Sequence, residues 1–79
     1  MSNEWPSMKA RKLRTILREL GYRKSHGKGS HEVLKADGRP TLIFGFHSKH
    51  TIPGGLVRSI LVRQAGLTVE EAKEVLGIG

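Results

Sequence analysis

Leucine and isoleucine recur near the start of the chain at the spacing of one side of an α-helix. The apolar positions i, i+3, i+4 and i+7 are Leu13, Ile16, Leu17 and Leu20. This spacing predicts an amphipathic helix, with Ser7 as the expected N-cap and Gly21 as the expected stop. Lysine and arginine fill most of the other positions, so the helix should bury one side and present positive charge on the other.

Three short runs of strand character follow, at residues 22–26, 30–36 and 40–46. The turns between them contain Gly-Lys-Gly and Asp-Gly-Arg-Pro, which are typical of hairpins. Because these connections are too short for crossover helices, the strands should form an antiparallel sheet. Pro40 is expected to begin its strand rather than interrupt it.

The apolar residues return to a helical spacing between Ile52 and Leu67, where Gly66 is the expected end of a second helix. A short acidic helix should follow, since Thr68 lies three residues before Glu71 as in a capping box. The order α-β-β-β-α, with an added C-terminal helix, predicts an α+β fold with helices on one face of a three-stranded antiparallel sheet. The other face is left open to water or to a ligand.

Positive charge dominates the chain. There are 14 lysines and arginines against 7 aspartates and glutamates, a net charge of +7. Residues 1–67 carry 13 basic and 4 acidic side chains, whereas residues 68–79 carry one lysine and three glutamates. A cationic body attracts polyanions, and nucleic acid is the most common one in the cytoplasm. A solvated basic face without a ligand is the alternative.

Length and composition narrow the class of protein further. The 79 residues fit one small domain. Cysteine is absent, which excludes disulfides, zinc ribbons and thiol catalysis and fits a reducing cytoplasm. No stretch approaches the ~20 apolar residues of a membrane span, and the start of the chain has no signal-peptide run. We therefore expect a soluble cytoplasmic protein.

Two runs look like known motifs but do not satisfy them. Residues 21–29 have five residues between their glycines and Gly29 after the lysine, and they lead into strands, so they are not a phosphate loop. His31 and Glu32 begin like a zinc-protease motif, but Lys35 stands where the second histidine belongs. A Ser30–His31–Asp37 set is also disfavoured, because adjacent strand residues point to opposite faces.

The four histidines leave two other possibilities. They are His26, His31, His47 and His50. A metal site made of them lacks the carboxylate pair or cysteine that usually completes a ligand set, so a structural or surface role is favoured over a metal. Acid–base chemistry on an RNA phosphodiester fits better, because RNA carries its own nucleophile, the 2′-hydroxyl. Histidine suits the two proton transfers, lysine and arginine suit the charge on the phosphorane, and no metal is required.

Strand alternation indicates which histidines share a face. In the third strand the inner set is Leu42, Phe44 and Phe46, which leaves Thr41, Ile43 and His47 on the open face if the strand stays regular. In the second strand the inner set is Leu34 and Ala36, which leaves His31, Val33 and Lys35 outside. His31 and His47 are therefore expected to share the open face. On pattern alone, two unrelated surface histidines are the favoured interpretation.

The order and spacing of four features resemble the HicA family of bacterial toxins. They are the opening Arg-Lys-Leu helix, the Lys-Gly-Ser-His turn, the histidine after the third strand, and the helix GGLVRSILVRQAGL. The resemblance covers Met8 to about Leu67. One HicA-like domain is thus expected over residues 1–79, with a core at 8–67 and a helical extension at 68–77.

The resemblance implies a fold like that of double-stranded-RNA-binding domains and a metal-independent messenger-RNA endonuclease with no cofactor. It implies a catalytic His31, with His47 as a candidate helper, and neutralisation by a HicB-type antitoxin. The expected RNA contacts are Lys28, Arg23, Lys24 and Ser30. Two positions depart from the family pattern, since many members have a second histidine at position 32 and a proline at position 45. A non-catalytic RNA-binding module and a protein that binds only an acidic partner are the alternative functions.

Overall fold

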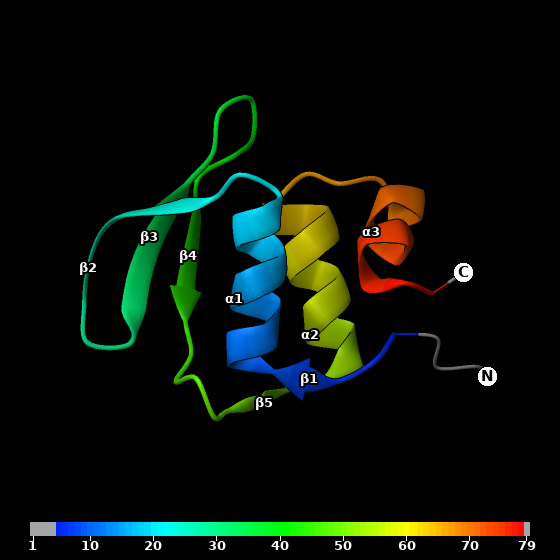
Figure 1. Cartoon of the computed structure of the whole chain (residues 1–79), viewed down its shortest axis with the longest axis horizontal. Coiled ribbons are helices and arrows are strands. Elements are labelled where there is room, and N and C mark those ends of the chain that lie inside the picture. The colour runs from blue at the N-terminus through cyan, green and yellow to red at the C-terminus, as the bar shows by residue number, and fades with distance from the viewer. Residues whose placement is uncertain (1–4, 79) are drawn as a thin grey trace.

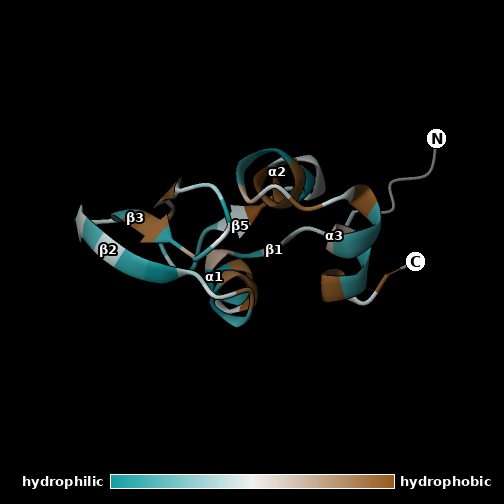
Figure 2. Ribbon diagram, turned by 90° about the horizontal axis from the view of Figure 1, so that it is seen from above, coloured by the Kyte–Doolittle hydropathy of each residue, from teal (hydrophilic) through white to brown (hydrophobic). Residues whose placement is uncertain are grey.

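The computed structural model describes residues 5–78 of the chain. In chain order the elements are β1 (Met8–Lys9), α1 (Ala10–Glu19), β2 (Arg23–Lys28), β3 (His31–Lys35), β4 (Leu42–Gly45), β5 (Thr51–Ile52), α2 (Gly54–Ser59), the π-helical η1 (Ile60–Gln64) and α3 (Val69–Leu76). Helices α1 and α2 lie side by side next to the sheet of β2, β3 and β4, and α3 lies beyond them (Figures 1 and 2). The α+β prediction is confirmed.

The main sheet has the predicted antiparallel order β2-β3-β4. Strands β3 and β4 are shorter than the sequence pattern suggests, whereas β2 extends to Lys28, and β4 begins at Leu42 rather than at Pro40. The prediction for Pro40 was therefore wrong. Its backbone carbonyl accepts a hydrogen bond from the Tyr22 hydroxyl at 2.6 Å instead of joining a strand. Tyr22 is fully buried, and this burial raises the pKa of its phenol.

The start of α1 also differs from the prediction. Its N-cap is Lys9, not Ser7, and no side chain caps it. The first two amides of the helix donate instead to the backbone carbonyls of His50 at 2.8 Å and Ser48 at 3.1 Å. These bonds satisfy amides that a helix leaves without internal partners, so the chain has no need of a serine cap here.

Those bonds depend on a short strand pair that the sequence pattern did not predict. Met8 pairs with Ile52 and Lys9 with Thr51, which brings β1 antiparallel to β5. Both apolar members of this pair are buried. The pair fixes the loop at residues 46–50 against the N-terminus of α1.

One hydrophobic core lies between the main sheet and the two central helices (Figure 2). The predicted inner residues of β3 and β4 are confirmed: Leu34, Leu42 and Phe44 are buried, and Ala36 and Phe46 pack against the core. Ile43, predicted to face outward, is 62% exposed. The sheet thus has one buried face and one open face, as its alternation predicts.

The two C-terminal helices are confirmed, although the second begins at Gly54 because Ile52 belongs to β5. The second helix runs through α2 and η1, where the Ala65 amide donates to the Ile60 carbonyl five residues earlier, at 2.9 Å. It stops before Gly66, which has a φ of +79°. Helix α3 has the predicted capping box between Thr68 and Glu71. It packs against η1, away from the sheet. No helix within residues 5–78 is long and apolar enough to cross a membrane.

Candidate active site

A β-bulge in β2 decides which of its side chains reach the open face of the sheet. Lys24 pairs with Leu34, but His26 pairs with Val33, so Ser25 is an extra residue without a partner opposite it. Residues that are directly opposite in an antiparallel pair project from the same face. Lys24 therefore shares the inner face with Leu34, while His26 turns outward with Val33.

His31 stands at the start of the central strand β3, at one end of this open face. It pairs with Lys28 of β2 on one side and with Gly45 of β4 on the other. A Cβ atom on Gly45 would lie 3.0 Å from Cδ2 and 3.1 Å from Nε2 of His31. The imidazole therefore lies over the space that a side chain at position 45 would fill. His31 is exposed to solvent in this position.

The open face as a whole combines positive charge with a small apolar strip. Its members by register are Arg23, His26 and Lys28 from β2, His31, Val33 and Lys35 from β3, and Ile43 and Gly45 from β4. Val33 and Ile43 are paired across the strands directly beside His31 and Gly45. We call this set of eight residues the open face.

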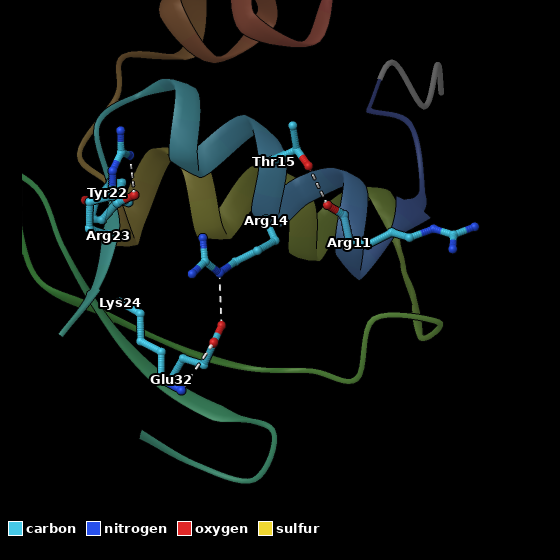
Figure 3. A network of polar contacts seen from close by, with 7 residues as sticks. All are labelled: Arg11, Arg14, Thr15, Tyr22, Arg23, Lys24 and Glu32. Atoms are coloured by element: carbon cyan, nitrogen blue, oxygen red, sulfur yellow. Dashed lines mark hydrogen bonds and ion pairs between the residues drawn. The ribbon is translucent and has the colours of Figure 1, made fainter. Parts of the chain in front are cut away.

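Glu32 lies on the opposite, helix-facing side of β3. Its carboxylate accepts a hydrogen bond from Nε of Arg14 at 2.9 Å and lies 3.9 Å from Nζ of Lys24 (Figure 3). The side chains of Arg14 and Glu32 are 19% and 25% exposed. Glu32 thus neutralises part of the charge on α1 and adds no negative charge to the open face.

A basic cleft of about 370 Å³ separates α1 from β3 and β4. Arg11, Arg14 and Arg18 line it from the helix, and Ser30 lines it from the turn before His31. Among the described residues, Nη1 of Arg14 is buried without a hydrogen-bond partner. The cleft and the open face are on opposite sides of the sheet and approach each other at the turn that holds Ser30.

The predicted RNA contacts are distributed over several places. Lys28 lies on the open face opposite His31, and Ser30 lines the basic cleft. Lys24 projects toward Glu32 on the inner side. Nη1 of Arg23 donates to the backbone carbonyl of Arg18 at 3.0 Å. It also donates to the backbone carbonyl of Tyr22 at 2.8 Å (Figure 3). Arg23 thus holds the C-terminal end of α1.

His47 was predicted to share the open face only if the third strand stayed regular as far as position 47, and this condition is not met. Strand β4 ends at Gly45, so alternation does not extend to position 47. His47 instead accepts, through its backbone carbonyl, a hydrogen bond from the His50 amide at 2.9 Å. The His50 ring stacks on Phe46 at 5.6 Å.

Sequence reasoning missed two features of the site. His26 was not assigned to the face of His31, because regular alternation along β2 gives the wrong side once a bulge intervenes. The arginines of α1 were expected on a solvated surface, and only the fold places them along a cleft. Within residues 5–78, no three histidine, aspartate or glutamate side chains converge as a metal-ligand cluster.

Comparison with known proteins adds one finding. The family model described as "HicA toxin of bacterial toxin-antitoxin" matches residues 10–67 of the 79-residue chain. This range includes α1, the whole main sheet and the second helix. Comparisons with curated proteins and with solved structures found no match. The chain belongs to the HicA toxin family of bacterial toxin–antitoxin systems.

Proposed function

We propose that this toxin is a metal-independent endoribonuclease that cleaves messenger RNA through acid–base chemistry at His31. The observation that carries the proposal is the position of His31. It is solvent-exposed at the start of β3, lies directly opposite Lys28, and has room for its ring over Gly45. Membership of the HicA toxin family supports the same function.

The chemistry requires only groups that this face presents. The 2′-hydroxyl of a nucleotide attacks the adjacent phosphorus, the bond from phosphorus to the 5′-oxygen breaks, and His31 transfers a proton in the process. The ammonium of Lys28 stabilises the negative charge that develops on the phosphorane oxygens. The products are a 2′,3′-cyclic phosphate and a free 5′-hydroxyl.

The surroundings of His31 suit a single RNA strand. Lys28 and Lys35 offer charge to phosphates on the open face, and Val33 and Ile43 offer an apolar surface to a base or sugar. The arginines of the basic cleft continue this charge around the turn at Ser30. Phosphate contacts of this kind position the RNA without reading its sequence.

A toxin of this family requires an antitoxin, and we propose a HicB-type protein that covers the open face. Ile43 is the most exposed large apolar side chain among the described residues, and it lies two strand positions from Gly45, beside His31. A partner with an acidic and apolar surface would bury Ile43 and neutralise Lys28 and Lys35. RNA and antitoxin would then compete for the same residues.

Inducible expression of the wild-type protein and of His31→Ala tests the proposed function. We expect growth arrest and RNA decay with the wild type and neither with the variant, while His50→Ala should behave as the wild type. Equal growth arrest and equal RNA decay with His31→Ala would exclude the role of His31. If the wild-type protein binds RNA but cleaves none, the non-catalytic RNA-binding module is the correct function.

A further inference from the structure

The bulge at Ser25 places a second histidine on the face that carries His31. Strand β2 contains only exposed residues, so burial does not determine which of its side chains face the core. The register does: His26 pairs with Val33, and Lys28 pairs with His31. In a regular strand, Ser25 would face outward and His26 would turn inward like Lys24; the bulge at Ser25 reverses this and turns His26 outward.

His26 and His31 are diagonal neighbours on this face. Diagonal neighbours in an antiparallel pair lie about 7–8 Å apart, and long or aromatic side chains bridge that separation. Lys28 stands two residues from His26 along β2 and directly opposite His31. The ammonium of Lys28 and the imidazoles of His26 and His31 therefore lie at the corners of a triangle on the open face.

Two further features support this arrangement of His26, Lys28 and His31. Nδ1 of His26 lies 3.3 Å from the Ser25 hydroxyl, which leaves Nε2 free for a ligand. A Cβ atom on Gly27 would collide with the backbone of His31 and Glu32. The two strands thus approach closely between His26 and Lys28, and only glycine permits it.

We propose that His26 is the second proton-transfer group of the cleavage reaction, a catalytic residue paired with His31. The proposal rests on the proposed function of His31. In one step the bond from the 2′-oxygen to phosphorus forms and the bond from phosphorus to the 5′-oxygen breaks. One imidazole takes the proton of the 2′-hydroxyl, and the other, as imidazolium, gives a proton to the leaving 5′-oxygen. Exchange with water then restores both rings.

The separation of the two histidines suits two proton transfers at one phosphodiester. The attacking and leaving oxygens lie on opposite sides of one phosphorus, and each needs a nitrogen within about 2.6–3.2 Å. Two imidazoles that exchange protons with these two oxygens must therefore lie several ångströms apart. Adjacent positions on one strand would not serve, since they point to opposite faces, whereas diagonal positions on paired strands do.

The test compares purified wild type, His26→Ala and the matched control His50→Ala on a short RNA substrate, with single-turnover cleavage and RNA affinity measured separately. His50 is also an exposed histidine, but it stacks on Phe46 outside the open face. For His26→Ala we expect cleavage to fall by about 10²–10⁴-fold with unchanged RNA affinity. Free imidazole should restore part of the rate, which a purely structural role would not allow.

Each outcome decides the question. Cleavage by His26→Ala at the wild-type rate overturns the inference, as does a loss that follows RNA affinity and does not respond to imidazole. His31→Ala run in parallel separates the two proposals. If His31→Ala is inactive and His26→Ala is fully active, His31 acts without His26 and only the present inference fails. If His31→Ala cleaves normally, the proposed function itself fails.

Discussion

Replacement of Glu32 by glutamine should destabilise the protein because it leaves the Arg14 charge without its partner inside the fold. Exposed ion pairs contribute about 0.2–1 kcal/mol, and loss of one partner from a fully buried pair costs about 3–5 kcal/mol. The Arg14 and Glu32 side chains are 19% and 25% exposed, which places this pair between the two cases. Nη1 of Arg14 already lacks a hydrogen-bond partner, so the guanidinium has little else to hold it.

We therefore expect Glu32→Gln to lower the free energy of unfolding by about 2 kcal/mol. For a domain of 60–100 residues, 1 kcal/mol corresponds to roughly 4–8 °C in the melting temperature, so Tm should fall by on the order of 10 °C. Urea unfolding and thermal melts at neutral pH measure both quantities. Glu19→Gln removes the same charge from an exposed position and should change the stability by less than about 0.5 kcal/mol.

A double-mutant cycle isolates the interaction from other effects. Arg14→Gln and Glu32→Gln together should cost less than the sum of the two single changes, with a coupling energy of about 1–2 kcal/mol. If Glu32→Gln is as stable as the Glu19→Gln control, or if the two changes are additive, the pair does not stabilise the fold and its placement between α1 and β3 is incorrect.

Three other variants test separate parts of the account. Gly45→Ala should displace the His31 ring and reduce RNA cleavage by on the order of 10–100-fold while the protein stays folded; an unchanged rate would contradict the packing of that ring. Arg18→Gln should weaken RNA binding and reduce the slope of log affinity against log salt by about 0.7, the value for one phosphate contact on a single strand; an unchanged slope would exclude the basic cleft. Thr68→Ala should cost about 1 kcal/mol at neutral pH, and the cost should shrink in acid.

The acid dependence of Thr68→Ala follows from Glu71. Hydrogen bonds from the backbone amide and then the side chain of Thr68 hold the pKa of Glu71 below its usual value. A carboxylate with a lowered pKa in the folded state stabilises the fold above its unfolded pKa, and that contribution is lost as the pH falls through the folded pKa. The difference in stability between the wild type and Thr68→Ala should therefore shrink as the pH falls below about 4. It should not vanish, because the Glu71 amide still donates to the Thr68 hydroxyl of the wild type in acid. A constant difference down to pH 2 would contradict this explanation.

Burial made the faces of β3 and β4 predictable from the sequence. Buried or partly buried apolar residues recur at every second position, at Leu34 and Ala36 and at Leu42 and Phe44, and a slip of one residue would expose this set. The inner positions of Leu34, Leu42 and Phe44 follow from this, and so does the outward position of His31. The apolar pattern of β3 and β4 is therefore enough to predict which face carries His31, the residue on which the proposed function depends.

The same logic fails where no apolar residue fixes the register. Strand β2 reads Arg-Lys-Ser-His-Gly-Lys and is exposed throughout, so the sequence gives no sign of the bulge at Ser25 or of the side that His26 takes. Ser7 has the right chemistry for a cap, yet backbone carbonyls from the loop at residues 46–50 satisfy the first amides of α1. That solution depends on the β1–β5 pair, which joins segments more than 40 positions apart.

The position of Glu32 in the fold explains how the chain accommodates this departure from the family pattern. As a sequence feature, Glu32 suggests a negative charge next to His31. In the fold, adjacent strand residues point to opposite faces, and the Glu32 carboxylate meets Arg14 of α1 on the helix-facing side. Its effect is therefore expected on stability and on the charge of the basic cleft, rather than on proton transfer at His31.

Single-turnover cleavage of a short RNA by purified His31→Ala, beside wild type and His50→Ala, tests the central claim most directly. We expect a rate at least about 10²-fold below wild type, a 2′,3′-cyclic phosphate as the wild-type product, an unchanged melting temperature, and an unaffected His50→Ala. Cleavage by His31→Ala at the wild-type rate would contradict the assignment of His31 as the group that cleaves RNA.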